Sequence, residues 1–160
     1  MVTQNVCGIC ARLGNTCCQE TEIYLTMGDV KRIASQVSRL DFFEYRKPLD
    51  PSYLDQDDDP VWAVQTIHRD GTRRVLKKKN EKDCLFLTEI GCQLSMEVRP
   101  LVCRLHPLTY TMDGLAEVLD QRCLSVLPEP AGALITAMGM NPERAMVWHR
   151  QLYQEIFDQE

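Results

Sequence analysis

The sequence Cys84-Leu-Phe-Leu-Thr-Glu-Ile-Gly-Cys92 opens the stretch on which the rest of the chain depends, and the stretch ends in Arg99-Pro-Leu-Val-Cys103-Arg-Leu-His-Pro107. It contains three thiols, each close to a turn residue or a proline that restricts the backbone. The other five cysteines lie outside it, at Cys7, Cys10, Cys17, Cys18 and Cys123. A long segment without cysteines separates Cys18 from Cys84. The amino-terminal cysteines and those from Cys84 onward could therefore share one site only if the folded chain brings them together.

Length and composition predict one domain over residues 1–160. The chain is 44% hydrophobic and 26% charged, which is typical of a globular protein that can bury a core. It contains no apolar run that could cross a membrane, and its first residues lack the pattern of a signal peptide, so a cytoplasmic location is expected. The net charge of −5 argues against nucleic acid and anionic membranes as partners.

Capping residues predict several helices. Thr26 and Asp29 form a capping pattern, so a helix is expected over about residues 27–39, and Asp41 repeats the pattern for a shorter turn that Pro48 ends. Pro100 is placed to open a turn carrying Cys103, and residues 131–138 suggest another short helix. An amphipathic C-terminal helix is expected over about residues 142–157, after Asn141, with its apolar face formed by Ala145, Trp148, His149, Leu152 and Ile156.

Alternating apolar and polar residues predict short strands at residues 23–25, 61–68, 73–78, 85–87, 93–94, 108–112 and 115–119. Asp70-Gly71 and Asp113-Gly114 are typical hairpin turns. Residues 49–60 include Asp57-Asp58-Asp59 but lack the spacing of a calcium loop, so a solvated loop is expected. The predicted fold class is α+β: a small domain with short helices, two or three β-hairpins and a cysteine-rich metal core.

The eight cysteines are interpreted as metal ligands. A reducing cytoplasm favours metal binding or redox chemistry over structural disulfides. Cys7-Gly-Ile-Cys10 has the spacing with which two thiolates bind one metal ion. A thioredoxin-like redox pair would instead lie between a strand and a helix, and here Gly14 and Asn15 follow. The candidate ligands are Cys7, Cys10, Cys17, Cys18, Cys84, Cys92, Cys103 and Cys123, although Cys18 or Cys123 could also be an ordinary buried cysteine.

Two arginines and a histidine accompany these cysteines. Four thiolates around Zn²⁺ or an iron–sulfur core leave a net negative charge. Arg99 and Arg104, on either side of Cys103, are candidates for offsetting that charge. His106 is close enough to Cys103 in the sequence to be an alternative ligand.

The order of these residues resembles the YkgJ-type cysteine-cluster family. The shared motifs are Cys-x-x-Cys, a Cys-Cys pair, Leu25-Thr-x-x-Asp29-x-x-Arg32-Ile, Cys84-x-Phe-Leu, Gly-Cys, Arg99-Pro-x-x-Cys103-Arg-x-x-Pro and a last cysteine, so the resemblance covers residues 7–123. It implies a domain that chelates zinc or iron, with all eight cysteines on family positions. The chain departs from the family in the longer spacing between Cys10 and Cys17, and in His106, where an aromatic residue is common.

The sequence leaves zinc and iron–sulfur open, because the spacings after Cys10 match neither a zinc ribbon nor a bacterial ferredoxin. A slight preference for iron or an iron–sulfur cluster rests on these looser spacings and on the arginines that flank Cys103. The main hypothesis is a cytosolic metal-binding protein that catalyses nothing itself and could serve a protein partner. One alternative is an iron–sulfur enzyme or electron-transfer component, because the resemblance extends to a flagellin lysine-methylating protein. Another is a zinc-stabilised interaction module. The sequence shows no phosphate-binding glycine loop and no defensible catalytic set.

Overall fold

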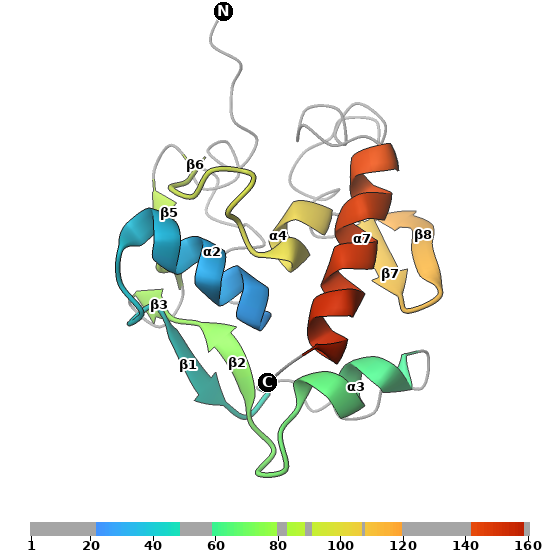
Figure 1. The fold of residues 1–160 in the computed structure, drawn as a ribbon, viewed down its shortest axis with the longest axis horizontal. Coiled ribbons are helices and arrows are strands. Elements are labelled where there is room, and N and C mark those ends of the chain that lie inside the picture. Colours follow the sequence, from blue (N-terminus) through green and yellow to red (C-terminus); the bar gives the residue numbers. More distant parts are fainter. Residues whose placement is uncertain are drawn as a thin grey trace, which may run out of the picture.

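The computed structural model describes residues 22–48, 59–79, 83–88, 91–106, 108–119 and 142–158. These residues form helices and four two-stranded antiparallel sheets, so the predicted α+β class is confirmed (Figure 1). The elements are α2 (Met27–Val37), β1 (Phe43–Arg46), α3 (Pro60–Thr66), β2 (Arg73–Leu76), β3 (Lys78–Lys79), β4 (Asp83–Cys84), β5 (Leu87–Thr88), β6 (Gly91–Cys92), α4 (Leu101–Leu105), β7 (Leu108–Thr111), β8 (Gly114–Leu119) and α7 (Pro142–Phe157).

Helix α2 begins where its capping residues predict. The Thr26 hydroxyl accepts a hydrogen bond from the Asp29 amide, and the Asp29 carboxylate accepts one from the Thr26 amide, which completes a capping box. The helix ends at Val37, two residues before the predicted end, because Ser38 adopts a left-handed conformation with φ 58°.

Two predicted elements are wrong. Residues 43–46 form strand β1 rather than a helical turn, and β1 pairs antiparallel with β2 from Phe43 opposite Leu76 to Arg46 opposite Arg73. Residues 61–68 are not a strand, because residues 60–66 form helix α3, capped by Asp59 with Pro60 at the first turn. At residues 61–68 the local cap and proline outweigh the alternating apolar and polar pattern. Strand β2 therefore pairs with β1, which is distant in the sequence, and not with residues 61–68.

Asp59 also differs from the solvated loop residue predicted for it. The residue is 7% exposed, and its carboxylate accepts hydrogen bonds from the Trp62 amide at the start of α3 and from the Tyr153 hydroxyl of α7. The carboxylate therefore connects α3 to α7. The rest of the expected loop, residues 49–58, lies outside the described residues.

The hairpin predicted over residues 108–119 is confirmed as β7 and β8, but its turn is Met112-Asp113, one residue before the predicted Asp113-Gly114, and Gly114 begins β8 at φ 150°. The strands expected near 85–87 and 93–94 are shorter and shifted: β4 pairs with β3, and β5 pairs with β6. The expected strand at residues 23–25 is a single bridge between Tyr24 and Val75. Helix α7 runs over residues 142–157 as predicted, whereas Asn141, Pro107 and the helix predicted at 131–138 lie outside the described residues.

The buried face of α7 contains Ala145, Trp148, Leu152, Tyr153 and Ile156. His149 is only half-buried, and its ring nitrogen lies 2.7 Å from the Thr111 carbonyl oxygen of β7. The histidine therefore connects α7 to the hairpin rather than filling the core. None of the described helices is long and apolar enough to cross a bilayer.

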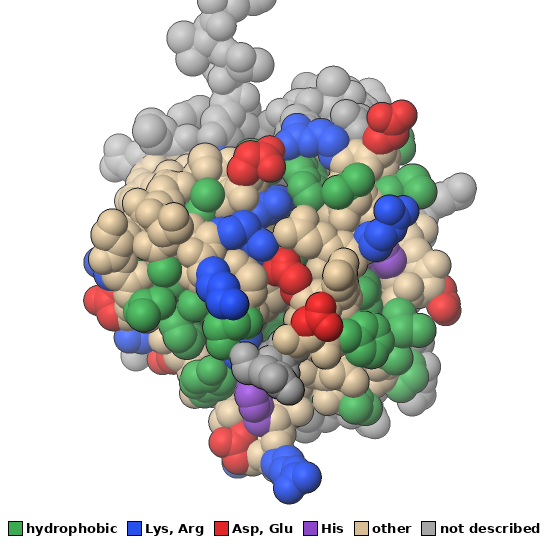
Figure 2. All heavy atoms as spheres, in the orientation of Figure 1, with side chains coloured by type: hydrophobic (Ala, Val, Ile, Leu, Met, Phe, Trp, Pro, Cys, Tyr) green, Lys and Arg blue, Asp and Glu red, His purple; other side chains and the backbone are tan. Residues whose placement is uncertain are grey.

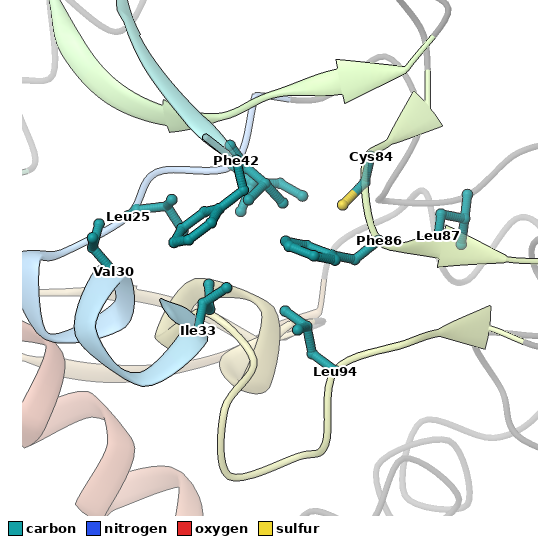
Figure 3. Close-up of a cluster of buried hydrophobic side chains, with 10 residues drawn as sticks. Leu25, Val30, Ile33, Phe42, Cys84, Phe86, Leu87 and Leu94 are labelled. Carbon is teal, nitrogen blue, oxygen red and sulfur yellow. The ribbon is translucent and has the colours of Figure 1, made fainter. Parts of the chain in front are cut away.

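Two hydrophobic clusters form the core, and α4 contributes to both. The first cluster lies beneath α2 and includes Leu25, Ile33 and Phe42, with the Phe42 and Phe86 rings 6.0 Å apart (Figure 3). The second cluster lies against α7 and includes Leu101 and Leu105 of α4. Cys103, between those two leucines in the sequence, packs against the first cluster instead. Helix α4 is therefore held from both sides, between α2 and α7 (Figure 1).

Candidate metal centre

Three of the eight predicted metal ligands lie in the described residues. Cys84 comes from β4, Cys92 from β6 and Cys103 from α4. Cys84 is 5% exposed and belongs to the first hydrophobic cluster, and Figure 3 shows its sulfur directed into that cluster. Cys92 and Cys103 are half-buried and pack against the same cluster. The fold thus brings three cysteines from three elements to one core.

These three cysteines do not make a complete metal site by themselves. Within the described residues, no three His, Cys, Asp or Glu side chains gather closely enough to hold a metal ion. His106 ends α4 and is half-buried, and its amide donates to the Val102 carbonyl oxygen at 3.2 Å. The remaining predicted ligands, Cys7, Cys10, Cys17, Cys18 and Cys123, lie outside the described residues. The convergence of both cysteine groups therefore stays a prediction.

The donor chemistry of Cys92 and Cys103 fits zinc, iron or an iron–sulfur centre. Thiolates are soft ligands, which these metals accept and calcium or magnesium do not. Both side chains are half-buried on elements that pack against the core, so they are neither freely mobile nor enclosed. Ligands held in this way lose little freedom when a metal binds.

Arg99 and Arg104 bind the backbone of the turn that precedes α4. The Arg99 Nε donates to the Leu94 carbonyl oxygen at 3.0 Å. The Arg104 guanidinium donates to the Arg99 and Glu97 carbonyl oxygens at 2.8 and 2.7 Å. These contacts fasten residues 94–99 to α4, which is a structural role that the sequence analysis did not foresee. The predicted role of the two arginines beside a thiolate centre stays a prediction.

The Arg104 side chain is an unusually buried cation. The residue is 4% exposed, and its guanidinium carbon lies 5.9 Å from the centre of the Trp148 ring. Burial, and after it the positive charge of Arg32, lowers the pKa of Arg104 from its ordinary value. An arginine still remains protonated at neutral pH. A positive charge is therefore buried at the position that follows Cys103.

A hydrogen-bonded ionic cluster connects α2, α4 and α7. Asp29 is fully buried and accepts from the Arg32 guanidinium at 2.7 Å and from the Leu101 amide at 3.1 Å. Glu155 of α7 accepts from the Thr26 hydroxyl at 2.8 Å and from two nitrogens of Arg32 at 2.8 and 3.1 Å. Figure 2 shows charged side chains of both signs adjoining on this face of the molecule.

In the sequence, Thr26 and Asp29 form a helix-capping pattern and belong, with Arg32, to the motif Leu25-Thr-x-x-Asp29-x-x-Arg32-Ile. Arg32 lies three residues after Asp29, and opposite charges at this spacing on one helix predict the ion pair that the structure contains. The contacts of this cluster with Leu101 and Glu155 join residues far apart in the chain, so no local pattern could reveal them.

Comparison with known proteins identifies a family. No curated protein and no solved structure matches the chain significantly. A family model described as "CxxCxxCC: Putative zinc- or iron-chelating domain" matches residues 6–124, which include all eight cysteines. Since that match covers most of the 160 residues, the chain belongs to the CxxCxxCC family.

Proposed function

We propose that this protein is a cytoplasmic metal-binding protein that holds iron, as an ion or an iron–sulfur cluster, through cysteine thiolates and catalyses no reaction itself. The observation that carries the proposal is the packing of Cys84, Cys92 and Cys103, from three separate elements, against one hydrophobic cluster. The ligands in this proposal are these three together with Cys7, Cys10, Cys17, Cys18 and Cys123, all within the family match.

The buried charge of Arg104 supports an anionic centre near Cys103. The contacts of this guanidinium within the described residues are two backbone carbonyls and the Trp148 ring, and no ion pair is among them. A buried charge without a close counter-ion carries a large desolvation penalty, and the charges of Asp29, Glu97 and Glu155 offset it only in part, because the pKa of Arg104 remains lowered. A thiolate-bound metal centre with net negative charge would reduce that penalty, and Arg99 would contribute in the same way.

The spacing of the cysteines favours iron over zinc. Cys84, Cys92 and Cys103 are too far apart in the sequence for the paired knuckles of a structural zinc site. In a [4Fe–4S] cluster each iron takes one cysteine, so the four ligands need not come as close pairs. The same thiolates could hold zinc, and in that case the protein would be a metal-stabilised module without redox chemistry.

Metal analysis of the full chain purified without oxygen tests the proposal. We expect iron, broad visible absorption and, for a cluster, acid-labile sulfide in proportion to iron. A colourless protein with stoichiometric zinc would contradict the iron assignment while keeping metal binding. A protein that contains neither metal, and that binds neither on anaerobic reconstitution, would overturn the proposed function.

Two neighbouring variants separate ligand loss from packing loss. Cys103→Ser should lower the metal content, and it should remove metal-linked stability of about 4 kcal/mol when free metal is a thousandfold above Kd. Val102→Ala is the matched control, because Val102 lies in the same helix and packs against both clusters without a thiol. The control should lower stability by about 1–2 kcal/mol and leave metal content unchanged. Equal metal content in Cys103→Ser and wild type would refute the role of this thiol.

A further inference from the structure

We infer that Asp29 is a positioning residue for the metal centre, because it caps the N-terminus of α4 from another helix and so orders the turn that carries Cys103. The inference rests on the proposed function, in which Cys103 is a ligand. Asp29 acts through α4, and its carboxylate is bound to the Leu101 amide.

Helix α4 needs an external cap. It has only five residues, Leu101–Leu105, and a helix this short is not stable alone. Its N-cap residue is Pro100, whose side chain makes no capping hydrogen bond. The first amides of any helix lack partners within that helix. The Asp29 carboxylate accepts from the first of these, the Leu101 amide, across 72 residues of chain.

The carboxylate is held tightly enough to act as a fixed cap. Asp29 is fully buried, and its other oxygen accepts from the Thr26 amide at 3.0 Å. Arg32 donates at 2.7 Å to the same Asp29 oxygen that accepts from the Leu101 amide, and Arg32 itself is held by Glu155 of α7. The cap is therefore anchored in α2 and α7, and its negative charge also suits the N-terminal end of the α4 dipole.

The cap is adjacent to the backbone that carries Cys103. The Cys103 and Arg104 amides both donate to the Pro100 carbonyl oxygen, at 2.9 and 3.1 Å, which closes the turn that begins beside the capped Leu101 amide. If the Leu101 amide loses its acceptor, this turn is expected to fray. Residues that support metal ligands typically contribute 10–100-fold in affinity, because ligands must be held within about 0.5 Å.

The test compares Asp29→Ala with Thr26→Ala in the metal-loaded full chain. Both variants break the capping box of α2, but Thr26→Ala leaves the carboxylate on the Leu101 amide. Zn²⁺ affinity is measured by competition with a chromophoric chelator under reducing, oxygen-free conditions. We expect a loss of about 10–100-fold for Asp29→Ala and less than about threefold for Thr26→Ala. Asp29→Asn, which keeps an acceptor oxygen, should recover part of the loss.

Hydrogen exchange gives a second readout that a general loss of stability would not produce. Amides of residues 101–104 should lose protection in Asp29→Ala relative to those in the middle of α7, and should keep it in Thr26→Ala. Equal protection of these amides in both variants, or equal loss of Zn²⁺ affinity, would overturn the inference. If the wild type binds no metal, the proposed function fails, and exchange at residues 101–104 still decides whether Asp29 caps α4.

Discussion

Gly28, in the first turn of α2, lies directly against Glu155 of α7. A Cβ at this glycine would be 1.9 Å from Glu155 Oε1, 2.5 Å from Cδ and 2.7 Å from Oε2. No such approach is tolerated, so Gly28→Ala must displace the carboxylate. The displaced oxygens are those that accept from the Thr26 hydroxyl and from Arg32. The substitution therefore disconnects α2 from α7.

The change in unfolding free energy caused by Gly28→Ala is the sum of two opposing effects. At an ordinary helical position, Gly→Ala stabilises by about 0.5–1 kcal/mol. Against this, Glu155 loses hydrogen bonds to a hydroxyl and a guanidinium, each worth about 1.5–3 kcal/mol for a charged group. The Glu155 side chain is 17% exposed, so water recovers part of the loss. We expect a net destabilisation of about 1–3 kcal/mol, or roughly 2–10 °C in Tm for a chain of this size.

Urea denaturation of a double-mutant cycle tests this reasoning, with all four proteins in the same metal state. Gly28→Ala should destabilise the wild type. In the Glu155→Ala background the obstructing carboxylate is absent, so the same substitution should stabilise by about 0.5–1 kcal/mol. The sign of the effect should thus reverse between backgrounds. Stabilisation by Gly28→Ala in both backgrounds would refute the contact between Gly28 and Glu155.

Two further predictions concern the contacts of α7. Burial alone would raise the pKa of Glu155, but hydrogen bonds from Arg32 and Thr26, with the Arg32 charge, hold that pKa below its ordinary value of 4.5. A lowered pKa stabilises the folded state above pH 4.5, and this stabilisation is lost as the pH falls through the pKa of Glu155 in the folded protein. The difference in unfolding free energy between wild type and Glu155→Gln should therefore become smaller in acid. Urea titrations at several pH values measure this difference in unfolding free energy, and a difference that stays constant with pH would contradict the lowered pKa of Glu155. Tyr153→Phe should lower stability by about 1–3 kcal/mol through the lost hydrogen bond to buried Asp59, and by much less in an Asp59→Ala background; equal losses in both backgrounds would show that this bond contributes nothing.

The position of α4 explains how a metal could stabilise this fold. One helix of five residues contacts the cluster beneath α2 through Cys103 and the cluster against α7 through Leu101 and Leu105. A metal bound at Cys103 would hold α4 in place, and α4 would in turn join the two clusters. Metal binding and folding are coupled in small cysteine-rich domains for this reason.

Local chemistry made several elements predictable. Thr26 and Asp29 form a capping box, Pro142 opens α7, and Asp113-Gly114 marks the turn of the 108–119 hairpin to within one residue. Each of these features depends on residues a few positions apart, so their effect can be read along the chain. The error at 43–46 has a different origin, because β1 pairs with β2, a strand that follows α3 in the chain. The error at 61–68 was local, because the Asp59 cap and Pro60 outweigh the alternating pattern there.

The amino-acid sequence by itself determined the eight cysteines, the motifs of the CxxCxxCC family, and the local caps and turns of an α+β chain. Only the tertiary structure decided that Asp29 caps α4, that Glu155 completes an ionic cluster, and that Cys84, Cys92 and Cys103 share one core. Residue types and their spacing follow directly from the chain. Contacts between distant segments arise from the packing of whole elements, which depends on every buried side chain at once.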